Sequence, residues 1–91
     1  MLDLNSSYIL LPNIVLKSVN NKFWALDTLS GKQFKLNRTA FEILSALSEN
    51  VVLDKIFNEI AQPYDVLMEV FIRDASNLIQ QAINNGIVEK R

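Results

Sequence analysis

Acid–base chemistry in this 91-residue chain would have to come from carboxylates, lysines and tyrosines, because the sequence contains no cysteine and no histidine. Thiol nucleophiles, disulfides, imidazole bases and the usual zinc ligand sets are therefore excluded. Asp27 and Asp74 could in principle face each other as a catalytic pair, but a capping or solvated role explains either one better. The other carboxylates are spread over predicted helices and turns. The sequence predicts a protein that is not an enzyme and that needs no cofactor or metal.

Phosphate and cation sites have no support in the sequence either. The two glycines, Gly31 and Gly86, are explained by a turn and a helix stop, so there is no glycine-rich phosphate loop. No calcium-loop spacing is present. A net charge of −1 and a pI near 5.2 give no electrostatic reason to expect nucleic acid or anionic lipid as a partner.

Alternating apolar residues predict three strands, at 14–19, 23–27 and 32–36. Asn20-Asn21 supplies the first turn, and residues 28–31 supply the second, with Gly31 free to take a left-handed conformation. Two short turns between three strands indicate an antiparallel meander. Residues 8–11 are apolar and precede Pro12, so they form either a short strand or an arm packed on the body.

Helical spacing of apolar residues follows from about residue 37. Either Asn37 or the capping box that starts at Thr39 begins the first helix, which ends at 48–50. The second helix covers 53–60 and stops before Pro63. The third begins after a cap at Asp65 and ends at Asn85-Gly86, with residues 87–88 extended. Its predicted apolar stripe consists of Leu67, Phe71, Ala75, Leu78 and Ala82, broadened by Val70 and Ile72.

These elements predict one domain over residues 1–91 of the α+β class. The expected fold is winged-helix-like, a three-stranded antiparallel sheet followed by three helices that cover one of its faces. No apolar run approaches the ~20 residues of a membrane span, and the amino terminus lacks the basic start of a secretory signal. The expected location is cytoplasmic.

Two binding functions fit such a fold. A winged-helix DNA-binding regulator is the alternative, but the predicted third helix carries Asp65, Glu69 and Asp74 against Arg73 alone, a face that would repel a duplex. The third strand is an edge of the meander, and its backbone can accept an added peptide strand. Lys32, Gln33 and Lys35 are also residues that guard an edge against unwanted pairing. Strand geometry alone therefore supports peptide binding and simple protection of the edge equally.

The stretch 26–40 resembles the signature of the PqqD-like family, also called precursor-peptide recognition elements. The shared features are a strand ending in Leu26-Asp27, a glycine turn, an aromatic-containing strand, and Leu36-Asn37-x-Thr39-Ala40 opening a helix. Asp74-Ala75, Leu78-Ile79 and Gly86-Ile87-Val88 are similar to the family's closing pattern, so the resemblance covers about residues 12–88. The chain departs from the family at Asn50, where glycine is frequent, and at Ala75 and Ala82, which replace larger aliphatics.

The resemblance implies a non-catalytic adaptor that binds the leader segment of a ribosomally made precursor peptide by strand addition. The adaptor would pass the leader to a separate enzyme, either a leader peptidase, as in lasso-peptide biosynthesis, or a radical enzyme. A homodimer through the same edge strand is a further expectation. Carried onto this sequence, backbone pairing and the cleft would involve Lys32, Gln33, Phe34, Lys35, Leu36, Val70, Arg73, Asp74 and Asn77.

Overall fold

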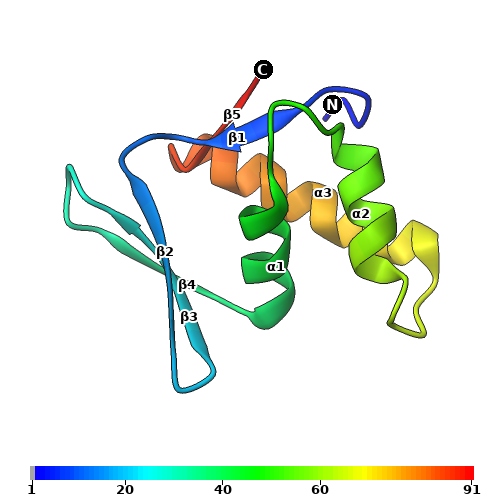
Figure 1. Cartoon of the computed structure of the whole chain (residues 1–91), viewed down its shortest axis with the longest axis horizontal. Helices are drawn as coiled ribbons and strands as arrows, with labels where there is room; N and C mark the ends of the chain where they lie inside the picture. The colour runs from blue at the N-terminus through cyan, green and yellow to red at the C-terminus, as the bar shows by residue number, and fades with distance from the viewer. Residues whose placement is uncertain (1) are drawn as a thin grey trace.

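The computed structural model describes residues 2–91, and Met1, where the predicted single domain begins, lies outside the described residues. It confirms the α+β class, with a three-stranded antiparallel sheet followed by three helices, and adds a small two-stranded sheet. Figure 1 shows the three-stranded sheet on one side of the molecule and the helices on the other. The elements are β1 (Tyr8–Leu10), β2 (Ile14–Val19), β3 (Lys22–Asp27), β4 (Gln33–Leu36), α1 (Arg38–Ala46), α2 (Leu53–Ala61), α3 (Met68–Asn84) and β5 (Val88–Lys90).

The predicted meander is confirmed in the order β2–β3–β4, with both pairs antiparallel. Asn20 and Asn21 have φ values of 52° and 62°, as a two-residue hairpin of mirror-image type requires. The second turn closes where the Asp27 N–H donates to the Lys32 carbonyl at 2.9 Å, and Gly31 adopts a φ of 78°. Both turns therefore fix the register of the strands that they join.

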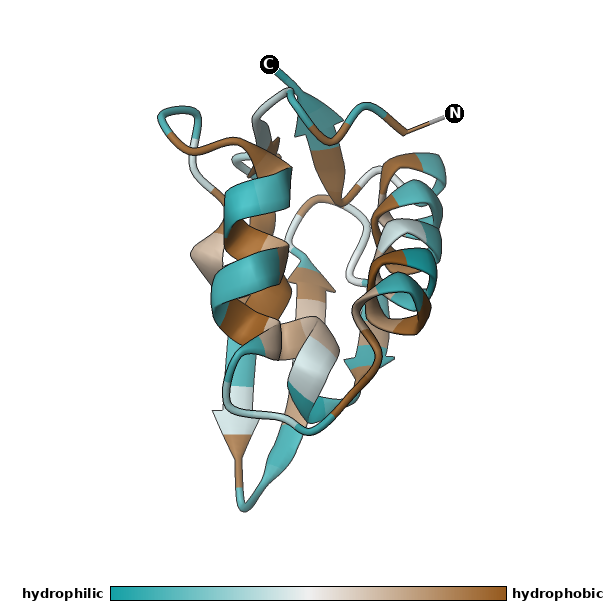
Figure 2. Ribbon diagram, turned by 90° about the vertical axis from the view of Figure 1, so that its right-hand side faces the viewer, coloured by the Kyte–Doolittle hydropathy of each residue, from teal (hydrophilic) through white to brown (hydrophobic). Residues whose placement is uncertain are grey.

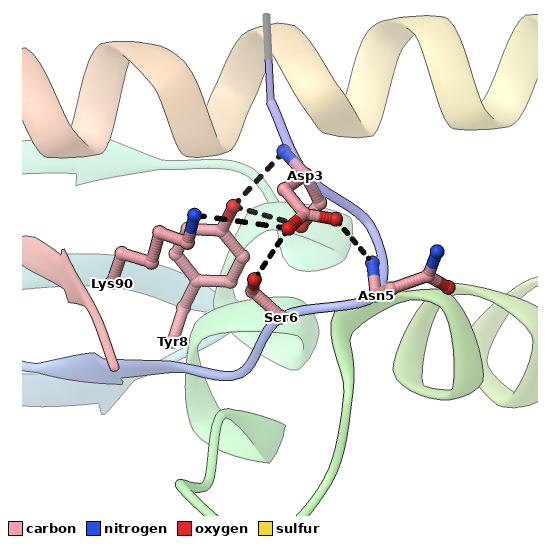
Figure 3. A network of polar contacts seen from close by, with 5 residues as sticks. All are labelled: Asp3, Asn5, Ser6, Tyr8 and Lys90. Atoms are coloured by element: carbon pink, nitrogen blue, oxygen red, sulfur yellow. Dashed lines mark hydrogen bonds and ion pairs between the residues drawn. The ribbon is translucent and has the colours of Figure 1, made fainter.

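Residues 8–10 form a strand, which resolves the alternative left open for this segment. In the two-stranded sheet β1 pairs with β5, and Tyr8 lies opposite Lys90. The Tyr8 side chain is only 2% exposed; its hydroxyl donates to the Asp3 carbonyl at 2.8 Å and accepts from the Asp3 N–H at 3.2 Å. Figure 3 shows the Asp3 carboxylate joined to Ser6, Asn5 and Lys90. These contacts hold the amino-terminal segment against the end of the chain.

The start of α1 is set by Asn37, whose Oδ1 accepts from the Ala40 N–H at 2.7 Å. Of the two predicted caps, Asn37 is therefore the one used and Thr39 is not. A tilted stack of Phe41 on Phe23, with ring centroids 4.8 Å apart, attaches α1 to β3. The Arg38 guanidinium lies 5.4 Å from the Phe23 ring centroid and covers this contact.

The predicted start of α3 at Asp65 is wrong. The helix begins at Met68, and Leu67 precedes it in an extended conformation without a side-chain cap. The chain between α2 and α3 is tied to α1 by Tyr64, whose hydroxyl donates to Glu42, and residues 65–67 have no regular secondary structure before α3. Leu67 is 70% exposed and so does not belong to the buried stripe that was predicted for it.

The core lies between the helices and the inner face of the sheet. Ile43, Phe57 and Ile79 have no exposed surface. The Phe57 and Phe71 rings pack edge to face, with their centroids 6.2 Å apart. Small residues on α3, including Ala75, let the helix backbone pack closely on this core. Figure 2 shows the hydrophobic residues of the helices turned inward and the hydrophilic ones turned outward.

Candidate functional site

The outer edge of β4 carries backbone groups that β3 does not use. Asp27 and Lys32 form a hydrogen-bonded pair at the turn, and such pairs alternate along an antiparallel ladder. Phe34 and Leu36 therefore direct their N–H and C=O groups toward β3, while Gln33 and Lys35 direct theirs away from it. Within residues 2–91 no strand pairs with this edge. The predicted open edge is present, and its free groups belong to Gln33 and Lys35.

Beside this edge, two cavities follow α3 and meet at Leu78, which lines both. The upper cavity has a volume of about 330 Å³ and lies between α1, the α2–α3 segment and the first half of α3. The lower cavity has a volume of about 150 Å³ and lies between β4 and the second half of α3. Together they form a groove, which we call the α3 groove, that runs from the open edge to Tyr64.

The lining of the α3 groove is mostly apolar. In the upper cavity, Val70, Phe71 and Leu78 from α3 face Ala40 and Ile43 from α1. The polar groups there are those of Asn37, Thr39, Tyr64 and Asp74. In the lower cavity, Phe34 and Leu36 face Ala82, with Gln81 and Asn85 also in the lining. An apolar groove with a few polar groups at its margin suits a peptide that inserts apolar side chains.

Charge at the α3 groove is confined to its margin. The Arg73 Nε lies 3.3 Å from an Asp74 carboxylate oxygen, and both side chains are about two-thirds exposed. At the other side of the upper cavity the Glu42 carboxylate accepts from Tyr64, and this hydrogen bond raises the pKa of the Tyr64 phenol. Such exposed charges contribute to register and selectivity more than to affinity.

The predicted site residues separate into three groups in the structure. Phe34, Lys35 and Leu36 line the lower cavity, and Val70 and Asp74 line the upper one. Lys32 and Gln33 lie at the turn end of β4 and line neither cavity, although Gln33 offers backbone groups at the edge. Arg73 and Asn77 are exposed on α3 beside the groove and also line neither cavity.

Several groove residues were missed from the sequence. Leu78 was assigned to the core stripe, and its helical spacing gave no sign that it separates two cavities. Gln81 and Asn85 extend the Val70–Asp74 face by further turns of α3, a periodicity that could have identified them. Tyr64 and Val66 come from the α2–α3 segment, whose irregular course up to Met68 was not expected.

The structure brings no catalytic centre together from the candidate carboxylates. Asp27 accepts from Asn13 Nδ2 at 2.8 Å and from groups of its own turn, whereas Asp74 pairs with Arg73. Among residues 2–91, no three carboxylates gather closely enough to hold a metal ion. None of the helices in this part of the chain has the length and apolar character to cross a bilayer.

Comparison with known proteins gives one family and two solved structures. The family model described as coenzyme PQQ synthesis protein D (PqqD) matches residues 14–88. One structure, TbiB1 in complex with the TbiA(beta) leader peptide, aligns with a TM-score of 0.77 at 21% identity, covering 89% of this chain and 94% of that one. The other, lasso peptide synthetase B1 complexed with the leader peptide, gives 0.80 at 24% identity, covering 92% and 99%. No curated protein matches.

Proposed function

The chain belongs to the family of coenzyme PQQ synthesis protein D, and on this premise we propose that it is a non-catalytic adaptor for the leader segment of a precursor peptide. Its partner would be a ribosomally made peptide, and the adaptor would present the bound leader to a separate leader peptidase or radical enzyme. The observation that carries the proposal is the open edge of β4, formed by the backbone of Gln33 and Lys35, directly beside the α3 groove. Both solved structures of similar fold are described with a leader peptide bound.

In the proposed complex the leader adds to β4 as an antiparallel strand. Its backbone exchanges hydrogen bonds with Gln33 and Lys35, which makes binding tolerant of sequence. Alternate side chains of the added strand then point toward α3, where Phe34 and Leu36 line the lower cavity and Val70 lines the upper one. The two cavities give the selectivity, and the Arg73–Asp74 pair stands at the margin where it can fix the register.

Two other partners bear on this proposal, one at the same edge and one at the helices. A second copy of the chain could pair through β4 when no leader is present, which would protect the edge from nonspecific association. DNA binding through a helix is not favoured, because the exposed part of α3 carries Glu69 and Asp74 beside Arg73. Leader binding should therefore compete with any edge-to-edge dimer and be indifferent to duplex DNA.

Proline substitution tests the strand addition. Lys35→Pro removes one N–H that faces the open edge and leaves the hydrogen bonds between β3 and β4 in place. We expect it to weaken leader binding by at least tenfold, whereas Lys35→Ala, which keeps the N–H, should bind nearly as well as the wild type. The matched control is Ser18→Pro, because the alternation along β2 turns the Ser18 N–H toward the opposite edge of the sheet.

The measurement is fluorescence anisotropy with labelled synthetic leader peptides of candidate precursors, repeated with labelled duplex DNA at the same salt. Val70→Asp, in the upper cavity, should abolish leader binding, and Val52→Asp should not. Val52 is similarly exposed and precedes α2, where aspartate is a favoured cap. Leader binding that is lost with Ser18→Pro and kept with Lys35→Pro would move the site to β2. Saturable DNA binding without leader binding would refute the adaptor function.

A further inference from the structure

The face of the β2–β3–β4 sheet that points away from the helices has no covering element within residues 2–91. Figure 1 shows the helices on one side of this sheet only. Residues on the inner face, such as Ala25, are buried against the core, whereas Val15 and Val19 on the other face are 45% and 49% exposed. We call this second face, with its aligned residues from all three strands, the outer sheet face.

Strand register determines which side chains meet on the outer sheet face. One row consists of Lys17, Trp24 and Lys35, because Lys17 lies opposite Trp24 and Trp24 opposite Lys35. The next row consists of Val15, Leu26 and Gln33. The face thus combines a half-buried tryptophan between two lysines with a neighbouring apolar pair. Tryptophan is enriched at protein contact surfaces, and the lysines add positive charge around it.

Charge is distributed unevenly between this sheet and the rest of the chain. Residues 14–36 contain four lysines and one aspartate, a formal charge of +3, while the remaining residues contain five cations and nine carboxylates, a charge of −4. The single aspartate, Asp27, is engaged in hydrogen bonds with Asn13 and the turn. A chain that is almost neutral overall therefore presents a cationic face on its sheet.

We propose that the outer sheet face is the docking surface for the maturation enzyme, and that it accepts an acidic surface bearing apolar side chains. This inference rests on the proposed adaptor function. Complementary charge selects the partner and accelerates its association, and Trp24 with Leu26 supplies apolar contact area. The aliphatic residues Val15 and Val19 favour a protein partner over a nucleic acid, which would need further aromatic residues for stacking.

The outer sheet face is continuous with the edge proposed to bind the leader. Lys35 contributes its side chain to this face and its backbone to the open edge of β4. A leader strand added to β4 would place alternate side chains beside Gln33 and Lys35, and it would extend the face by one strand. An enzyme seated there would contact the adaptor and the leader together, so leader binding should increase its affinity for the adaptor.

The test uses the purified enzyme that matures the bound precursor, titrated against the full chain with and without leader. Lys17→Glu should weaken enzyme binding by about tenfold or more, because it places a carboxylate against an acidic surface. Val15→Glu, in the neighbouring row, should have the same effect. The matched control is Lys55→Glu on α2, an equal charge reversal at an exposed lysine away from the sheet, which should bind the enzyme like the wild type.

Leader binding is measured separately for each variant by fluorescence anisotropy of the labelled leader. Neither Lys17→Glu nor Val15→Glu should change the affinity for the leader. Enzyme affinity that stays within twofold of the wild type in both variants would overturn the docking surface, as would a wild-type chain that binds leader but not enzyme. Lys17-dependent binding of single-stranded RNA that excludes the enzyme would also overturn it. Failure of the wild type to bind leader would instead refute the adaptor function, and the enzyme titration would still decide the role of the outer sheet face.

Discussion

The hydroxyl group of Tyr64 lies 3.2 Å from a carboxylate oxygen of Glu42, and this contact joins the α2–α3 segment to α1 at the upper cavity of the α3 groove. The contact replaces the regular helical structure that the sequence predicted to begin at Asp65. It leaves Tyr64 and Val66 in the lining of a cavity that a longer α3 would have altered. A contact between two surface side chains thus helps to define one end of the proposed peptide site.

The Tyr64–Glu42 contact predicts an unusual tyrosine titration. Hydrogen bonding to Glu42, assisted by desolvation, raises the pKa of Tyr64 above its ordinary value of 10.0. Because the folded-state pKa lies above the unfolded one, the contact stabilises the fold fully below pH 10 and is lost as the pH rises through the folded-state pKa. An ultraviolet titration should show that the Tyr64 phenol ionises above its ordinary pKa. Glu42→Gln should return it toward the ordinary value, and an unchanged titration in that variant would argue against the contact.

The cap of α1 can be tested by a pair of substitutions. Asn37→Ala removes the side-chain acceptor for the Ala40 N–H and should lower the free energy of unfolding by about 1 kcal/mol. Thr39→Ala, at the residue that fits the competing capping box, should lower it by less than about 0.5 kcal/mol. Urea denaturation followed by circular dichroism measures both. A larger loss for Thr39→Ala than for Asn37→Ala would mean that the helix begins at the other cap.

Acid should weaken the fold through two aspartates. Hydrogen bonds from Asn13, Leu29 and Ser30 lower the pKa of Asp27 below 3.8. The pKa of Asp3 is also lowered, chiefly by Ser6. Because the folded-state values lie below the unfolded ones, this stabilisation is present above pH 3.8 and is lost as the pH falls through the folded-state pKa.

Thermal unfolding followed from neutral to acidic pH should therefore show a decrease in Tm on the acid side, and Asp27→Asn should make that decrease smaller. Asp65→Asn is a suitable control, because in the structure this residue caps no helix. An acid transition that is identical in Asp27→Asn and the wild type would contradict the assignment.

The end of α3 depends on the backbone conformation of Gly86, which has a φ of 73°. A Cβ atom at this position would have no heavy atom within 4 Å, so the cost of a side chain comes from the backbone alone. Gly86→Ala should lower the free energy of unfolding by roughly 1–2 kcal/mol. Gly86→Asn should cost less, since asparagine tolerates left-handed angles. Equal stability of Gly86→Ala and the wild type would show that the chain can leave α3 by another path.

Local features of the fold were predictable from the sequence, and features set by distant contacts were not. The turns at Asn20-Asn21 and Gly31 follow from residue types that tolerate positive φ, so the meander and its open edge were expected. The start of α3 was missed because Tyr64 contacts a helix more than twenty positions earlier in the chain. Leu78 packs against the core as its helical spacing predicts, but periodicity does not reveal the two cavities that it also lines.

The row of Lys17, Trp24 and Lys35 on the outer sheet face was only partly predictable from the sequence. The predicted strands already implied that Lys17, Trp24 and Lys35 share a face, since side chains alternate along each strand. The register that places the three side chains opposite one another came from the structure. Lys32 and Lys35 alone are too few to form a cationic surface along one strand. Counting across neighbouring strands instead of along one strand reveals the larger cluster.

The pairing of β1 with β5 joins opposite ends of the chain, with Tyr8 across from Lys90 and the Arg91 N–H donating to the Ser7 carbonyl at 2.9 Å. Such a pairing closes a loop that spans most of the polypeptide, and its entropic cost is recovered only when the rest of the domain is already in place. We therefore expect the β1–β5 pairing to form last during folding, and the amide hydrogens of these two strands to exchange first with solvent. Since β1 and β5 pair near the two ends of the chain, a linker could join the ends, and a circular permutant opened at the exposed turn around Leu29 should keep the same architecture.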